Sequence, residues 1–92
     1  MNKTELIWDV ADDTGIPRDA SERAVSATLK SIAETISKGE DVVIPGFGTF
    51  SRKTRKARKG HNPKTGEAID IPATTIPVFR PGKKLKAVVN AD

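Results

Sequence analysis

The chain has 92 residues, a net charge of +4 at pH 7 and no cysteine. This length allows one domain with little room for a self-sufficient core, and the lack of cysteine excludes disulfides and thiolate chemistry. No apolar run approaches the roughly 20 residues that a membrane span needs, and no secretory signal opens the chain, so we expect a cytoplasmic protein.

A first helix is predicted over residues 3–14. Its apolar residues recur at helical spacing on one face and are Leu6, Ile7, Val10 and Ala11. Gly15 is expected to end this helix, and Pro17 prevents its simple continuation.

A longer second helix is predicted over residues 18–38, opened by Pro17 and ended by Gly39. Its apolar stripe consists of Val25, Leu29, Ile32 and Ile36. A stripe on so long a helix indicates packing on more than its own sheet. Together with the small body, it favours an obligate homodimer.

Three strands are predicted to follow, over residues 41–45, 49–59 and 67–79. The segment 62–66, Asn-Pro-Lys-Thr-Gly, is the strongest turn signal in the chain. Pro72 and Pro77 cannot donate to a ladder, so in the third strand they must face solvent or interrupt pairing.

A short last helix is predicted over residues 83–90, with Leu85, Val88 and Val89 available for burial. The predicted fold is α+β: an N-terminal helical hairpin, a three-stranded antiparallel sheet with a long β-ribbon arm, and a short C-terminal helix. We expect a single domain, with a body of residues 1–51 and 77–92 and an arm of about 52–76.

Charge is distributed unevenly along the chain. Residues 1–41 contain five basic and nine acidic residues, whereas residues 42–92 contain eleven basic and three acidic ones. Such asymmetry indicates a nucleic acid or an anionic membrane as partner. No predicted helix pairs a basic face with a large apolar face, so the membrane alternative is weak.

The predicted arm carries most of the positive charge. Residues 51–66 hold seven Lys or Arg and no Asp or Glu: Arg52, Lys53, Arg55, Lys56, Arg58, Lys59 and Lys64. These side chains can neutralise phosphates and release counterions. Because they repel one another, we expect the arm to be mobile alone and ordered on DNA.

Two turns offer more specific contacts. Pro63 at the arm tip has a rigid ring that could wedge between base steps of a duplex, or it could merely shape the turn. The N-terminus of the last helix, at Gly82 and Lys83, could hold a phosphate, or it could be an ordinary cap.

Catalytic and nucleotide-binding chemistry have little support. The only histidine, His61, lies in the basic arm, with no obvious nucleophile–base pair. The segment GFGTFS at 46–51 has Ser51 in place of the third glycine of a dinucleotide fingerprint and is followed by a basic strand. We predict no enzyme activity, metal, cofactor or small-molecule substrate.

Four separate segments resemble the bacterial histone-like HU family, which includes the integration host factor subunits. They are MNKTELI at 1–7, GFGTF at 46–50, GHNPKTGE at 60–67 and FRPGKKLK at 79–86. The resemblance covers essentially the whole chain. It implies an intertwined homodimer whose two arms embrace the minor groove, with a proline in each arm turn partly intercalated so that the DNA bends.

The resemblance assigns the intercalating position to Pro63, basic arm positions to Lys53, Arg55 and Arg58, and flanking-DNA contacts on the body to Lys3, Lys83 and Lys86. With the arm charges and the turn, the expected DNA-binding set is Lys3, Lys53, Arg55, Arg58, Lys59, His61, Asn62, Pro63, Lys64, Arg80, Lys83 and Lys86.

Three positions depart from the family's common pattern. His61 stands where arginine is frequent, so one contact with DNA should be weaker and sensitive to pH. Trp8 stands where a small or polar residue is usual, and it could pack at the helix edge or stay exposed. Asp9 replaces an apolar residue and could shift the register of the first helix.

The expected function is therefore that of a nucleoid-associated architectural protein that binds, bends and compacts double-stranded DNA with low sequence specificity. Two alternatives remain open. The chain could be one subunit of a sequence-specific heterodimer of the integration host factor type, or a basic protein that binds RNA.

Overall fold

The computed structural model describes residues 1–91. They form two compact units, residues 1–34 and the residues from 35 onward, and each unit is described by itself. The helices are α1 (Lys3–Thr14), α2 (Arg18–Ser37) and α3 (Lys83–Val89). The strands are β1 (Val42–Ile44), β2 (Gly48–Arg55), β3 (Arg58–His61), β4 (Ala68–Ile71) and β5 (Thr74–Pro81).

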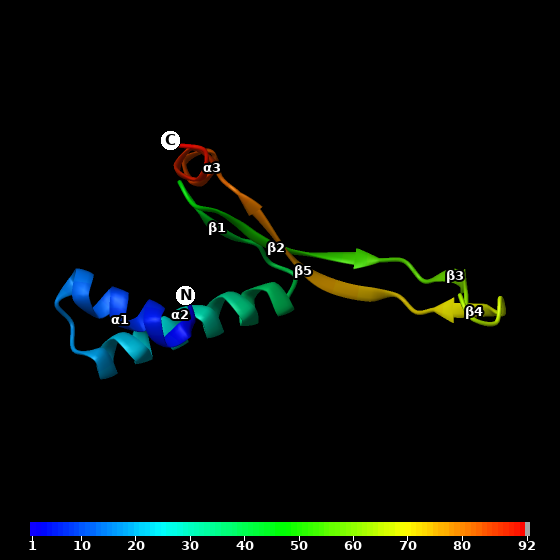
Figure 1. Cartoon of the computed structure of the whole chain (residues 1–92), viewed down its shortest axis with the longest axis horizontal. Helices are drawn as coiled ribbons and strands as arrows, with labels where there is room; N and C mark the ends of the chain where they lie inside the picture. Colours follow the sequence, from blue (N-terminus) through cyan, green and yellow to red (C-terminus); the bar gives the residue numbers. More distant parts are fainter. Residues whose placement is uncertain (92) are drawn as a thin grey trace. The chain divides into compact units, whose positions relative to one another are not determined.

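In the first unit, α1 lies alongside the N-terminal part of α2 (Figure 1). Asn2 caps α1, and its side-chain oxygen accepts a hydrogen bond of 2.8 Å from the backbone N–H of Glu5. Gly15 ends the helix in the left-handed conformation, and its N–H donates to the carbonyl of Ala11. These ends confirm the predicted helical hairpin.

The core of this unit is small. Ile7 and Ala11 of α1 are buried, whereas Leu6 and Leu29 stay exposed. An apolar groove of about 320 Å³ remains open, and it is lined by Leu6, Val10, Ala24, Val25, Thr28 and Leu29. The apolar stripe predicted on α2 is therefore covered only in part by the chain itself.

The second unit is built on an antiparallel sheet of strand order β1-β2-β5. The long ladder between β2 and β5 runs from the pair Gly48↔Pro81 to the pair Arg55↔Thr74. Pro77 lies within β5, an edge strand, where a residue without an N–H can be accommodated.

The predicted β-ribbon arm is present, but each of the predicted strands 49–59 and 67–79 is divided into two shorter strands. β3 and β4 form a separate two-stranded sheet, with pairs from Arg58↔Ile71 to His61↔Ala68. Residues 56–57 and 72–73 separate it from the main ladder. The physical reason is Pro72, which offers no N–H to a partner strand. Figure 1 shows β3 and β4 extending the ribbon away from α3.

Three phenylalanines cluster where the ladder begins. The ring centroids of Phe50 and Phe79 are 4.7 Å apart, and Phe47 lies 5.5 Å from Phe79. These distances are in the range of favourable aromatic packing. Phe47 and Phe79 are nevertheless 45% and 38% exposed, so the aromatic cluster is not fully covered by this chain.

The helix α3 follows directly from β5. The N–H of Gly82 donates to the carbonyl of Phe47 at 2.8 Å, which ties the start of α3 to the β1–β2 turn. Leu85 is half-buried as expected. Val88 and Val89 are 72% and 74% exposed, so the expectation of their burial was wrong for the single chain.

Ser21 on α2 is the one fully buried side chain among residues 1–91. Its hydroxyl oxygen has no hydrogen-bond partner within that range. A buried hydroxyl without a partner loses its hydration and gains nothing in return, which costs about 1–3 kcal/mol.

We predict that Ser21→Ala stabilises the protein. The half-buried Ser26 on the same helix provides the matched control, because Ser26→Ala gives the same gain in helix propensity, about 0.5 kcal/mol. The unfolding free energy of Ser21→Ala should exceed that of Ser26→Ala by about 1 kcal/mol. Urea denaturation at one fixed protein concentration measures the difference, and equal values would show that the Ser21 hydroxyl is satisfied in solution.

Candidate nucleic-acid interface

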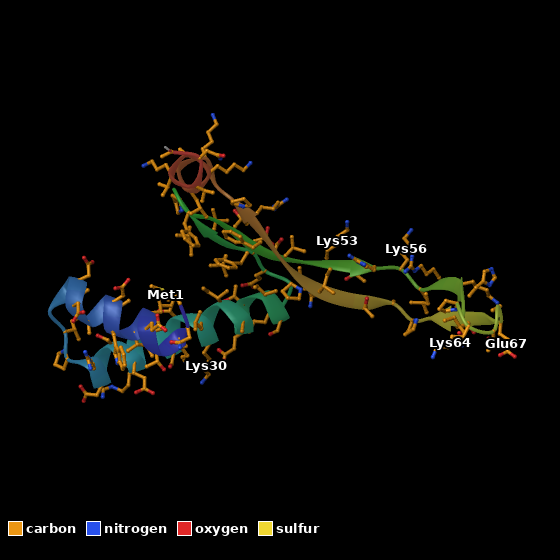
Figure 2. The ribbon with its side chains drawn as sticks, in the orientation of Figure 1. Met1, Lys30, Lys53, Lys56, Lys64 and Glu67 are labelled. Atoms are coloured by element: carbon orange, nitrogen blue, oxygen red, sulfur yellow. The ribbon has the colours of Figure 1, made fainter. Side chains whose placement is uncertain are left out.

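The basic residues of the arm are all exposed and follow the ribbon from its base to its tip. Lys53 and Arg55 lie on β2, and Arg58, Lys59 and His61 lie on β3. Side chains alternate between the two faces of a strand, so Lys53 and Arg55 share one face of β2. Figure 2 shows Lys53 and Lys56 projecting from the ribbon and Lys64 at its tip.

The tip is a tight turn built by Asn62. The backbone N–H of Asn62 donates to the carbonyl of Glu67 at 2.8 Å, and its carbonyl accepts from the N–H of Gly66 at 2.7 Å. Its side-chain oxygen accepts from the N–H of Lys64 at 2.9 Å. Gly66 has a φ of 73°, which favours glycine. The predicted turn at 62–66 is therefore present, and Asn62 holds it through both its backbone and its side chain.

Pro63 follows Asn62 in this turn, and its side chain is exposed. The hydrogen bonds of Asn62 close the turn on both sides of the ring, so the proline is held at the end of the ribbon. A rigid apolar group at the end of a basic ribbon is the geometry that a wedge between base pairs requires.

One pair of charges interrupts the positive potential of the arm. The ammonium of Lys59 lies 3.7 Å from a carboxylate oxygen of Asp70 across the β3–β4 pair. Both side chains are highly exposed, so the pair contributes little to stability. It does, however, give Lys59 a protein partner that competes with a phosphate.

The remaining predicted contacts lie outside the arm. Arg80 is on β5, and Lys83 and Lys86 are on α3, all exposed within the second unit. Lys3 is exposed at the start of α1 in the first unit. Gly82 provides no side-chain cap for α3. A phosphate contact at the start of this helix stays a prediction.

Two arginines have partners that the sequence analysis missed. The Arg18 guanidinium lies over the Trp8 ring, 4.7 Å from its centroid, which is a cation–π geometry. Trp8 is therefore packed on one side while 44% of it stays exposed.

Arg52, which we grouped with the phosphate-binding residues, donates to the carbonyl of Ser37 at 3.0 Å. Strand alternation in the sequence could have indicated this contact, because Arg52 falls on the same face of β2 as Phe50.

Asp9 is exposed on α1, in a groove that it shares with Leu6, Val10, Asp12 and Asp13. Within residues 1–91, no group of three or more histidine, cysteine or acidic side chains is arranged to hold a metal ion. Over the same range, no helix combines the length and apolar character needed to cross a bilayer.

Comparison with known proteins agrees with this architecture. The family model described as "Bacterial DNA-binding protein" matches residues 1–90. A prophage-derived DNA-binding protein HU 2 of Bacillus subtilis is 52% identical over 91 residues, which cover 99% of each chain. The DNA-binding protein HU of Geobacillus stearothermophilus is 49% identical over 89 residues, 97% of this chain and 99% of the relative.

Solved structures give the same result. An Anabaena HU–DNA cocrystal structure has a TM-score of 0.91 and 40% identity, with complete coverage of both chains. An HU mutant from Thermotoga maritima has a TM-score of 0.73 and 31% identity, covering 98% of this chain and all of the other. The chain belongs to the bacterial DNA-binding protein family, the family of the HU proteins.

We predict that Asp70→Asn tightens binding to duplex DNA because it frees Lys59 and removes a negative charge from the arm. The expected gain is roughly twofold to fivefold per arm, as for the removal of one exposed ion pair. Glu67→Gln is the matched control, since it removes the other acidic charge of the arm. Fluorescence anisotropy at fixed salt gives both affinities, and equal gains would show that the Lys59–Asp70 pair has no role.

Proposed function

We propose that this chain is an architectural protein that binds duplex DNA through the minor groove with low sequence preference and bends it. Its membership of the HU family and the HU–DNA cocrystal structure among its neighbours both support DNA as the ligand. The observation that carries the proposal is the paired arm, with exposed cations along it and Pro63 held at its tip.

Affinity in this proposal comes from phosphate contacts. Lys53, Arg55 and Arg58 are exposed along the ribbon, and each cation that meets a phosphate releases counterions. Sequence preference comes from deformability, because an apolar wedge that enters from the minor groove must unstack a base step. Flexible, nicked or A·T-rich duplexes are therefore the preferred substrates. The role is structural and not catalytic, and its site in the cell is the nucleoid.

We propose further that the active form is an intertwined homodimer. Phe47 and Phe79, Leu29 on α2, and Val88 and Val89 on α3 are all exposed in the single chain. A second copy that covers these side chains would supply the core that so small a body lacks. It would also provide the second arm, so that one duplex is gripped at two places.

The wedge is tested with Pro63→Ala. We expect fluorescence energy transfer across an end-labelled duplex to report a smaller bend at saturation. The preference for a gapped over a linear duplex should drop roughly tenfold, which corresponds to about 1.4 kcal/mol of wedge energy. Affinity for the linear duplex should change little. An unchanged bend would remove intercalation from the proposal.

Arg55→Ala is the matched control for Pro63→Ala, because it alters charge and leaves the tip intact. Its bend at saturation should remain, while the slope of log K against log salt should shrink by about 0.9 for each phosphate that is no longer neutralised. In a dimer the substitution is present in both arms, so two phosphates are affected.

The dimer is tested by sedimentation equilibrium of the purified single chain. We expect twice the chain mass, and a melting temperature that rises with protein concentration because folding and association are coupled. A folded monomer would contradict the homodimer. A chain that folds only when a different family member is added would favour the heterodimeric alternative.

A further inference from the structure

The C-terminus of α2 is closed by two backbone hydrogen bonds. The N–H of Gly39 donates to the carbonyl of Ile36 at 2.9 Å, and the N–H of Glu40 donates to the carbonyl of Thr35 at 3.2 Å. This is the Schellman pattern, which serves two of the carbonyls in the last turn. The carbonyl of Ser37 comes next, and it accepts a hydrogen bond of 3.0 Å from Nη1 of Arg52.

The Arg52 guanidinium packs against the backbone of Gly39. A Cβ atom at position 39 would lie 2.9 Å from Nη2 of Arg52 and 3.4 Å from its Cζ. Gly39 also has a φ of 86°, a conformation that side chains disfavour. The same glycine therefore ends the helix and leaves room for the cation.

The charge of Arg52 suits this position. The exposed carbonyls at a helix C-terminus carry partial negative charge and favour a cation. The last turn of α2 contains no basic residue of its own, and Arg52 of β2 adds a cation there in addition to Lys38, which directly follows the helix.

Strand alternation separates Arg52 from its basic neighbours. Arg52 shares a face of β2 with Phe50 of the aromatic cluster, whereas Lys53 and Arg55 lie on the opposite face. Arg52 is also paired with Pro77, close to the base of the arm. It belongs to the basic run by sequence and to the body by its contacts.

We infer that Arg52 is a positioning residue that fastens the base of the arm to the end of α2, and is not a phosphate contact. The fixed guanidinium holds β2 against the Ser37–Gly39 turn and so sets the direction in which the ribbon leaves the sheet. The effect of Arg52 on bending rests on the proposed function, but its effect on the end of α2 needs no DNA.

The test compares Arg52→Ala with Lys53→Ala, two neighbouring substitutions that remove the same charge from the same strand. Without DNA, Arg52→Ala should lower the melting temperature by about 4–8 °C at fixed protein concentration and should speed hydrogen exchange at the amides of Gly39 and Glu40. Lys53→Ala should do neither. With DNA, Arg52→Ala should keep the wild-type salt slope and broaden the distribution of bend angles in single-molecule energy transfer.

The inference would be overturned if Arg52→Ala reduced the salt slope by as much as the loss of a phosphate-binding cation, or if hydrogen exchange at Gly39 and Glu40 stayed at the wild-type rate without DNA. Faster exchange with an unchanged bend distribution would contradict the proposed role of the arm in bending and leave the contact of Arg52 with α2 in place. If Lys53→Ala leaves the slope unchanged, the proposed phosphate contact at Lys53 fails, while the result for Arg52 stands. Arg52→Lys covers the case in which the alanine variant does not fold. Lysine keeps the charge at the helix end but cannot donate from a planar guanidinium. The hydrogen-exchange rates at Gly39 and Glu40 should therefore lie between those of the wild type and those of amides without a hydrogen bond.

Discussion

The antiparallel pairing of β2 with β5 is the constraint on which the second unit depends. It brings Phe50 directly opposite Phe79, which creates the aromatic cluster, and it carries the chain outward to Arg55 and Thr74, where the ladder ends. Beyond Phe50, β2 pairs with β5 alone, and the cations of this part of the strand are exposed. One ladder thus links the hydrophobic part of the unit to its charged part.

The basic residues of the arm look alike in the sequence, but in the part of the chain that the structure describes some of them have partners within the protein and others do not. Lys53 and Arg55 have no protein partner that limits their reach among residues 1–91, and they are available for a polyanion. Arg52 is bonded to the end of α2, and Lys59 faces Asp70. Two of the basic residues in the run therefore have partners within the protein, which the sequence alone does not show.

The sequence predicted most of this fold because its signals are local. Gly15 and Gly39 end helices, Pro17 opens one, and the Asn62–Gly66 turn closes the ribbon as expected. What it could not predict depends on contacts distant in the chain. The bond from Arg52 to Ser37 needs the three-dimensional position of the helix end, and the missing partner of the Ser21 hydroxyl needs the packing around it. Pro72 can be seen in the sequence, but the sequence does not show whether this proline interrupts strand pairing or lies on the open edge of a strand.

That break has a mechanical consequence. The four-residue β3–β4 ladder is joined to the rest of the ribbon only through two short unpaired links, at residues 56–57 and 72–73. Torsion at these links does not disturb the hydrogen bonds of β2 with β5. The β3–β4 ladder can therefore open without breaking any hydrogen bond of the longer β2–β5 ladder. The aromatic cluster lies on the β2–β5 side of this break, so opening at the end of the ribbon leaves its packing intact.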